Sequence, residues 1–151
     1  MPPDTPAAAD PTLTIPCVFC GAWNRVDAGR VLDRPKCGEC AKPMLLDRPL
    51  PLTDDTFARV IAEAGIPVVV DFYADWCGPC KVMAPQYGAA ASKLPQVRFA
   101  KLDIDRAPLA SARHQIRSVP TLALFRGGTE LARASGAMSA EKLLAWLRSK
   151  L

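Results

Sequence analysis

Three pairs of cysteines, each with two residues between its members, constrain this chain more than any other feature. The pairs account for all six cysteines of the 151 residues: "CVFC" at Cys17 and Cys20, "CGEC" at Cys37 and Cys40, and "WCGPC" at Cys77 and Cys80. Sulfurs at this spacing can exchange between dithiol and disulfide, or they can bind a metal. The fold and the chemistry of the chain therefore depend on which pairs exchange disulfides and which bind a metal.

The first residues help to decide what environment the sulfurs meet. The start, "MPPDTPAAAD", has no Lys or Arg and no apolar h-region, so we do not interpret it as a secretory signal and we expect a cytoplasmic protein. The apolar runs fall well short of the roughly 20 residues needed to cross a membrane, and we expect no membrane partner. In a reducing compartment, structural disulfides are disfavoured, and CxxC pairs are better interpreted as redox centres or metal ligands.

The charged residues are spread along the chain. There are 19 basic and 15 acidic residues, a formal charge of +4, and no stretch forms a dense basic stripe. Such a pattern gives little electrostatic support for a nucleic-acid partner. We expect a mildly basic, solvated surface and a monomer.

Composition divides the chain into four parts. We predict a disordered Pro/Ala-rich tail, a four-cysteine zinc-binding module, a linker and a larger domain, at residues 1–14, 15–46, 47–52 and 53–151. The linker should lead into a short strand, which Pro49 and Pro51 would confine to the edge of a sheet.

The larger domain begins with a helix, a buried strand and a second helix. Thr53 can cap the first helix, whose predicted buried face holds Phe57, Val60, Ile61 and Ala64 and which should end at Gly65. "PVVVDFYA" is nearly continuous in apolar residues, which is typical of a strand covered on both faces. A helix should follow from about Gly78 to Leu94, with a kink at Pro85.

The rest of the domain shows the same regular patterning. We predict a strand in "VRFAKLDI", a short helix near residues 108–115, a hairpin that turns at Gly127-Gly128, and a last helix that Ser139 caps. The order of elements, βαβαββα, predicts an α/β fold in which helices flank a mixed sheet.

Cys77 and Cys80 lie where the buried strand should end and a helix should begin. Backbone N–H groups and the macrodipole at a helix N-terminus favour an anion, so a cysteine there should be enriched in the attacking thiolate. Pro79 fits the first turn, where its missing N–H costs little. We therefore predict that Cys77 attacks a disulfide and that Cys80 resolves the mixed disulfide.

Asp71 interrupts the apolar strand, where an unpaired carboxylate is costly. We favour a role as general base, acting on the Cys80 thiol directly or through water, over a partly exposed strand-end residue. Lys101, in the next predicted strand, is either its charge partner or a lysine that extends to solvent.

The segment "VVVDFYADWCGPCKVMAP" resembles the active-site segment of thioredoxins, and "SVPTLALFRGG" and "ASGAM" resemble later thioredoxin motifs in the expected order. The resemblance covers about residues 50–151 and departs at Tyr73, where the family often has Trp. It implies the thioredoxin fold, protein disulfide reductase activity on oxidised proteins, and reduction by an NADPH-dependent thioredoxin reductase. It also supports the base role of Asp71.

The same resemblance implies the residues that meet substrate. They surround the two sulfurs in members of the family and match Trp76, Gly78, Pro79, Val119, Pro120 and Gly136 here. The proline at the position of Pro120 is cis in the family, and its neighbour, matching Val119, pairs its backbone with the bound peptide. His114, the only histidine, is expected to be an ordinary surface residue.

The four remaining cysteines have the spacing of a tetrahedral zinc site. Sixteen residues separate the pair Cys17–Cys20 from the pair Cys37–Cys40, and we expect one structural zinc ion per chain, with disulfides as the weaker alternative. Metal ligation would replace the core that so small a module lacks. Trp23 and Phe19 could form a docking surface or pack over the metal, and packing is favoured.

"CVFCGAWNRV" and "PKCGECAKPM" resemble the zinc segments of one class within the family, the zinc-containing bacterial thioredoxins of the thioredoxin 2 type. The leading interpretation is a cytosolic disulfide reductase whose zinc module is structural or redox-sensing. Two alternatives stay open: a zinc-dependent interaction or chaperone protein that uses the thioredoxin fold as an adaptor, and a disulfide oxidase or isomerase.

Overall fold

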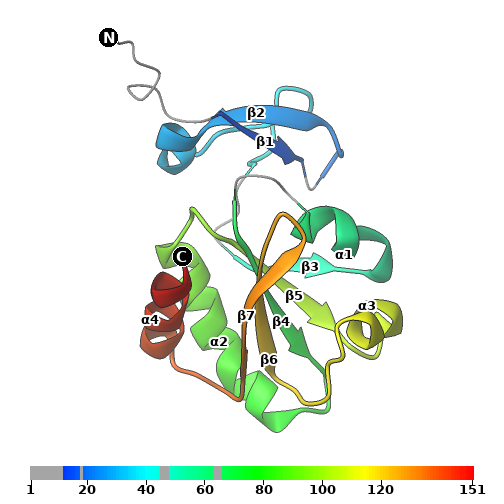
Figure 1. Cartoon of the computed structure of the whole chain (residues 1–151). Coiled ribbons are helices and arrows are strands. Elements are labelled where there is room, and N and C mark those ends of the chain that lie inside the picture. Colours follow the sequence, from blue (N-terminus) through cyan, green and yellow to red (C-terminus); the bar gives the residue numbers. More distant parts are fainter. Residues whose placement is uncertain (1–11, 18, 45–47, 63–65) are drawn as a thin grey trace. The chain divides into compact units, whose positions relative to one another are not determined.

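A computed structural model describes residues 12–17, 19–44, 48–62 and 66–151, and the chain divides into two compact units, Met1–Leu45 and Leu46–Leu151 (Figure 1). Each unit has its own strands and its own buried residues. In the part of the chain that the structure describes, no helix is both long enough and apolar enough to cross a membrane.

The first unit is built on a two-stranded antiparallel sheet. β1 (Thr12–Pro16) pairs with β2 (Trp23–Asp27), and a 3-10 segment follows at Ala28–Asp33. Leu13, Ile15 and Val26 are buried on one face of this sheet. The predicted disordered tail was therefore too long, because residues 12–14 belong to β1 and alternate between exposed and buried positions; residues 1–11 lie outside the described part.

The second unit is a five-stranded mixed sheet with the order β3-β5-β4-β6-β7. Its strands are β3 (Leu50–Leu52), β4 (Val68–Tyr73), β5 (Arg98–Asp103), β6 (Thr121–Arg126) and β7 (Thr129–Ser135). β3, β5 and β4 run parallel, whereas β6 is antiparallel to β4 and β7 is antiparallel to β6. β3 contains Pro51 and occupies an edge, as the prolines predict, so residues 50–52 of the expected linker are part of the sheet.

Among the described residues of this unit, four helices cover the sheet, two on each face (Figure 1). They are α1 (Asp54–Ile61), α2 (Gly78–Lys93), α3 (Pro108–Arg113) and α4 (Ala140–Lys150). Thr53 caps α1 and Ser139 caps α4 through their side chains, as predicted. Pro85 lies inside α2, which continues to Lys93. Ala64 and Gly65, expected at the end of α1, lie outside the described residues, and α1 itself ends at Ile61.

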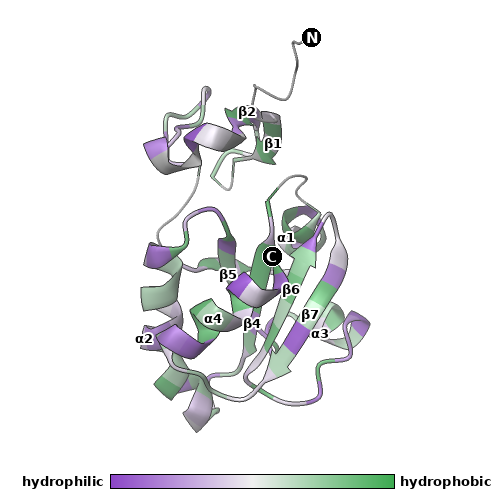
Figure 2. Cartoon of the chain, turned by 60° about the vertical axis from the view of Figure 1, so that its left-hand side comes forward, coloured by the Kyte–Doolittle hydropathy of each residue, from purple (hydrophilic) through white to green (hydrophobic). Residues whose placement is uncertain are grey.

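Alternation along β4 directs its side chains into two separate cores. Val68, Val70 and Phe72 pack with α1 and α3, whereas Val69 packs with α2 and α4. The centre of the sheet is accordingly hydrophobic, while hydrophilic segments lie on the outer surfaces of α2 and α4 (Figure 2). Because the period of a strand is two, Asp71 faces the same side as Val69, which is the side of α2 and its cysteines.

One helix depends on another for its N-terminus. α3 has only six residues, and its own N-cap, Ala107, makes no side-chain capping bond. Instead, the carboxylate of Asp54, at the start of α1, accepts hydrogen bonds from the backbone N–H groups of Leu109 and Ala110 at 3.2 and 2.8 Å. The free N–H groups of α3 are therefore satisfied by a residue more than fifty positions away in the sequence.

Candidate functional site

Cys77 and Cys80 form a disulfide at the N-terminus of α2, with 5.3 Å between their Cα atoms. Cys77 is the N-cap of the helix, and the backbone N–H of Cys80 donates to its Sγ at 3.2 Å. Both sulfur-bearing residues are only 4% exposed. A sulfur held here faces the positive end of the helix, which favours its thiolate when the disulfide is reduced.

Residues from other loops surround the disulfide. Val119 places its carbonyl oxygen 3.6 Å from Cys77 Sγ, and the Val119–Pro120 peptide bond is cis, as the resemblance implies. Gly136 donates its N–H to the carbonyl oxygen of Pro120 at 2.9 Å and has φ of +95°. The structure thus brings together the sulfurs and the backbone predicted to meet a substrate.

Trp76 is 68% exposed beside the disulfide, and Gly78 and Pro79 are also exposed. The indole Nε1–H of Trp76 donates to the carboxylate of Asp105 at 2.9 Å, which fixes the ring to the loop after β5. Sequence reasoning did not identify Asp105, because the contact joins two loops 29 positions apart and neither carries a local pattern that pairs them.

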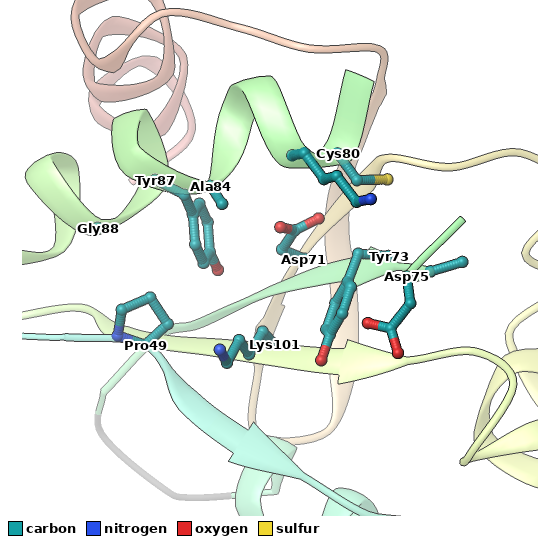
Figure 3. Close-up of a pocket in the computed structure, with 11 residues that line it drawn as sticks. Pro49, Asp71, Tyr73, Asp75, Cys80, Ala84, Tyr87, Gly88 and Lys101 are labelled. Carbon is teal, nitrogen blue, oxygen red and sulfur yellow. The ribbon is translucent and has the colours of Figure 1, made fainter. Parts of the chain in front are cut away.

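Beneath Cys80 lies a cavity of about 250 Å³. Its lining includes Asp71 and Tyr73 from β4, Lys101 from β5, and Cys80 and Tyr87 from α2 (Figure 3). A cavity of this size with several polar groups can hold water. It therefore connects Cys80 with the carboxyl group of Asp71.

Asp71 is 5% exposed, and among the described residues its Oδ1 has no hydrogen-bond partner. Burial raises the pKa of this carboxyl group to about 7, and the charge of Lys101 moves the pKa in the opposite direction. Asp71 and Lys101 are Cα partners in the parallel pairing of β4 with β5. A carboxyl group poised near neutral pH can both accept and release a proton under ordinary conditions.

Lys101 and Tyr73 meet at the same cavity. Lys101 Nζ lies 5.9 Å from the centroid of the Tyr73 ring, and Tyr73 is half-buried. Burial, followed by the charge of Asp103, raises the pKa of the Tyr73 hydroxyl group. Lys101 therefore lies near Asp71 and influences it by charge, which agrees with the partner interpretation from the sequence.

The other four cysteines form a compact cluster in the first unit. The Sγ atoms of Cys17, Cys20, Cys37 and Cys40 all lie within 4.8 Å of one another, and the four residues are free cysteines. Cys17 and Cys40 are 3.7 Å apart at sulfur, and so are Cys20 and Cys37. Four thiolates about 2.3 Å from a tetrahedral zinc would be separated by roughly 3.8 Å, so the donor set and its spacing fit zinc.

Backbone N–H groups point at these sulfurs. Phe19 donates to Cys17 Sγ and Glu39 donates to Cys37 Sγ, each at 3.4 Å. Hydrogen bonds from the Cys40 backbone, the Asn24 side chain and the Glu39 backbone, in that order, lower the pKa of Cys37 to about 6. These donors therefore favour the thiolate of Cys37, the form of cysteine that binds a metal.

Two aromatic residues near this cluster have exposed side chains. Phe19 is 50% exposed and Trp23 is 59% exposed, so neither ring is buried in the first unit. Phe19 instead lies under Lys42, whose Nζ is 4.9 Å from the ring centroid.

Comparison with known proteins agrees with both parts of this geometry. The family described as "Thioredoxin" matches residues 48–149, and "Thioredoxin 2, N-terminal" matches residues 16–42. Thioredoxin C-3 of Corynebacterium nephridii is 41% identical over 139 residues, which cover 92% of this chain and 96% of that protein. Thioredoxin of Allochromatium vinosum is 42% identical over 99 residues, covering 65% and 92%.

A solved structure gives the same answer for the fold. The long form of thioredoxin f from spinach chloroplast has a TM-score of 0.65 and 30% identity, and the match covers 70% of this chain and 88% of that one. Three features of the structure agree with this family: the mixed sheet, the disulfide at the start of α2 and the cis Val119–Pro120 bond. The chain therefore belongs to the thioredoxin family and is a thiol-disulfide oxidoreductase.

Proposed function

We propose that this protein is a cytoplasmic protein disulfide reductase that acts through Cys77 and Cys80. The observation that carries the proposal is the disulfide at the N-terminus of α2, directly above a cavity that connects Cys80 with Asp71. The exposed Trp76 and the carbonyl oxygen of Val119 beside Cys77 supply surface and backbone for an extended substrate segment.

Reduction of a substrate proceeds in two exchanges. The Cys77 thiolate attacks one sulfur of the substrate disulfide; a new S–S bond forms, the substrate S–S bond breaks, and the released substrate thiolate takes up a proton. Cys80 then loses its proton to Asp71, directly or through water in the cavity, and attacks Cys77 Sγ. The second substrate thiol leaves, two electrons have passed to the substrate, and Cys77–Cys80 is a disulfide again.

Restoring the dithiol requires a donor of two electrons. We propose an NADPH-dependent thioredoxin reductase as that donor and oxidised proteins as substrates, consistent with the family. Trp76, Gly78, Pro79, Val119, Pro120 and Gly136 are the residues proposed to contact the substrate. The geometry around Cys77 favours thiol–disulfide exchange over the adaptor alternative, because it provides both an attacking sulfur and a resolving sulfur with its own base. The choice between net reduction and net oxidation is set by the reduction potential of the pair.

We further propose that Cys17, Cys20, Cys37 and Cys40 hold one structural zinc ion. When bound, zinc would supply a cross-link between the two halves of the first unit, and no redox chemistry. The spacing of the four sulfurs and the N–H groups directed at them support this proposal. Metal content measured on purified protein, with one zinc per chain expected, tests it.

The reductase is tested with insulin as substrate, in the presence of NADPH and a thioredoxin reductase. The expected result is NADPH oxidation and insulin precipitation that both require Cys77. Aggregation of an unfolded protein that is suppressed without any need for Cys77, together with no insulin reduction, would support the chaperone alternative instead. A reduction potential far above that of typical thioredoxins would favour the oxidase.

A further inference from the structure

The two CxxC turns of the first unit are built alike. In each, the first cysteine donates its N–H to a carbonyl five residues later: Cys17 to Ala22 at 2.8 Å, and Cys37 to Lys42 at 2.9 Å. Backbone bonds therefore fold each turn on itself. Among the described residues, no backbone hydrogen bond joins one turn to the other, so the relative position of the two sulfur pairs needs another explanation.

Asn24 supplies a link between the two turns. Its Nδ2 donates to the carbonyl oxygen of Ala22, in the first turn, at 3.1 Å, and also to Cys37 Sγ, in the second turn, at 3.3 Å. Its Oδ1 accepts the N–H of Gly38 at 2.9 Å. The assignment of oxygen and nitrogen follows from the chemistry, because the Gly38 N–H requires an acceptor and a carbonyl oxygen requires a donor.

The strand fixes where Asn24 points. It is the Cα partner of the buried Ile15 in the pairing of β1 with β2, and it lies on the same face of β2 as the buried Val26, two positions along. Asn24 is thus a polar residue on the apolar face of a short strand, a position that is costly unless its hydrogen bonds are made. Here they are made to one metal-site sulfur and to the turn that carries it.

We propose that Asn24 is a positioning residue of the metal site, which docks the second CxxC turn onto the first and tunes the Cys37 thiolate by donating to its sulfur. This inference rests on the proposed zinc site. Asn24 adds a side-chain donor at 3.3 Å to the backbone N–H groups directed at Cys37 Sγ, among them that of Glu39 at 3.4 Å. Cys37 is 3% exposed, whereas Cys20 is exposed. Donation to a bound thiolate draws charge from the sulfur, which makes it less reactive and keeps it on the metal.

The test compares Asn24→Asp and Asn24→Ala with the unchanged full-length chain. Asn24→Asp keeps the shape and the acceptor for Gly38, but it removes the donor to Cys37 Sγ; Asn24→Ala removes every bond. Zinc affinity is measured by competition with a chromogenic chelator, and we expect a loss of about 10- to 100-fold in both variants. Arg25→Ala is the matched control, because Arg25 is the next residue of β2 and is exposed.

A second readout separates tuning of the sulfur from simple loss of structure. The Co²⁺-loaded forms should all show a tetrahedral thiolate spectrum, with the sulfur-to-metal charge-transfer band of both Asn24 variants moved to lower energy, since the sulfur has lost a donor. Weaker binding with an unmoved band would overturn the proposal, as would Asn24→Asp behaving like Arg25→Ala. If the unchanged chain bound neither metal, the zinc site itself would be refuted, and this inference with it.

Discussion

The three cysteine pairs share their first turn and differ in the backbone that comes after it. In each pair, the residue four positions after the first cysteine donates its N–H to the carbonyl oxygen of that cysteine; these residues are Gly21, Ala41 and Lys81. After Cys80 the turn continues as the 16-residue helix α2. After Cys20 and Cys40 it stops, because Gly21 and Ala41 have φ of +80° and +63°. Spacing alone therefore does not distinguish a redox pair from half of a metal site.

The surroundings of the sulfurs complete the difference. In the second unit, one pair forms a disulfide at a helix N-terminus with a buried carboxyl group below it, and among the described residues no further cysteine joins it. In the first unit, two pairs face one another with four sulfurs within 4.8 Å. The same spacing thus suits disulfide exchange when a helix follows, and it suits the proposed metal site when a second turn faces it.

The sharpest way to break this comparison is to remove one active-site sulfur at a time. Cys77→Ser should abolish insulin reduction, because the attacking thiolate is gone. Cys80→Ser should retain the attack and accumulate mixed disulfides with substrate, because only resolution fails. Non-reducing electrophoresis with mass spectrometry distinguishes the two. Trapped substrate on Cys80 in the Cys77→Ser protein would reverse the assignment of roles.

Removal of the metal should affect one unit and spare the other. Zinc binding to a four-thiolate site contributes about 10–16 kcal/mol to the folding of a small domain, and the first unit has few other buried residues. After chelation we expect the NMR signals of residues 12–44 to collapse to a narrow range, while those of residues 66–151 persist and insulin reduction continues. Signals of the first unit that stay dispersed without metal would contradict a structural role, and their return on adding zinc is the control.

Asp71→Asn should change both kinetics and stability. The folded pKa of Asp71, about 7, exceeds the ordinary value of 3.8 for this group, so the folded state binds the proton more tightly than the unfolded state. Wild-type stability should therefore fall as the pH rises from about 4 to 7 and level off above that, by an amount of up to about 4 kcal/mol. The free energy of unfolding of the Asn variant should not fall in this way. Measured in urea, it should exceed that of wild type most at pH 8 and only slightly at pH 4.

The same substitution should slow release of the mixed disulfide near neutral pH, because Cys80 loses its proton acceptor. Single-turnover kinetics with a fluorescent disulfide measures this step. Lys101→Met provides a comparison that alters the charge beside Asp71 while leaving its carboxyl group in place. If Asp71→Asn and wild type had identical kinetics and an identical pH dependence of stability, Asp71 would have no role in proton transfer.

The smallest expected effect concerns the residue that directly follows each CxxC pair of the first unit. Ala41 has the same left-handed backbone conformation as Gly21, and this conformation costs a residue with a Cβ about 1 kcal/mol. Ala41→Gly should therefore stabilise the zinc-bound first unit by roughly 0.5 kcal/mol, since relief of strain exceeds the added freedom of the unfolded chain. Gly21→Ala is the reciprocal change and should destabilise it. Chelator-induced unfolding measures both changes. A gain in stability from Ala41→Gly that matches the loss from Gly21→Ala would support the equivalence of the two turns.

Much of this architecture follows from local patterns. The apolar run of β4, the caps at Thr53 and Ser139 and the Gly127-Gly128 turn each act over a few residues, and the structure confirms each of them. Asp71 was recognisable because a charge within an apolar run is costly. Asn24 carried a weaker signal of the same kind, because it is a polar residue on the same strand face as the apolar Val26.

Contacts between distant segments were not predictable from the sequence. His114 was expected to be a plain surface residue, yet its ring packs edge-on against Phe57 and Phe125, with centroids 5.1 and 5.3 Å away. Burial lowers the pKa of His114 in this position. The partnership of Trp76 with Asp105 is of the same type. Such pairs depend on how the helices and loops settle on the sheet, which no spacing within one segment encodes.

The bond from Asp54 to α3 has a consequence for how the molecule opens. A six-residue helix has little stability of its own, so α3 should lose its N-terminal hydrogen bonds whenever the start of α1 frays. The backbone amides of Leu109 and Ala110 should then exchange with solvent deuterium at rates set by α1 rather than by their own helix. Since Asp105, which accepts the hydrogen bond of the exposed Trp76, lies just before α3, we expect breathing at the start of α1 to loosen the loop that holds the Trp76 ring as well.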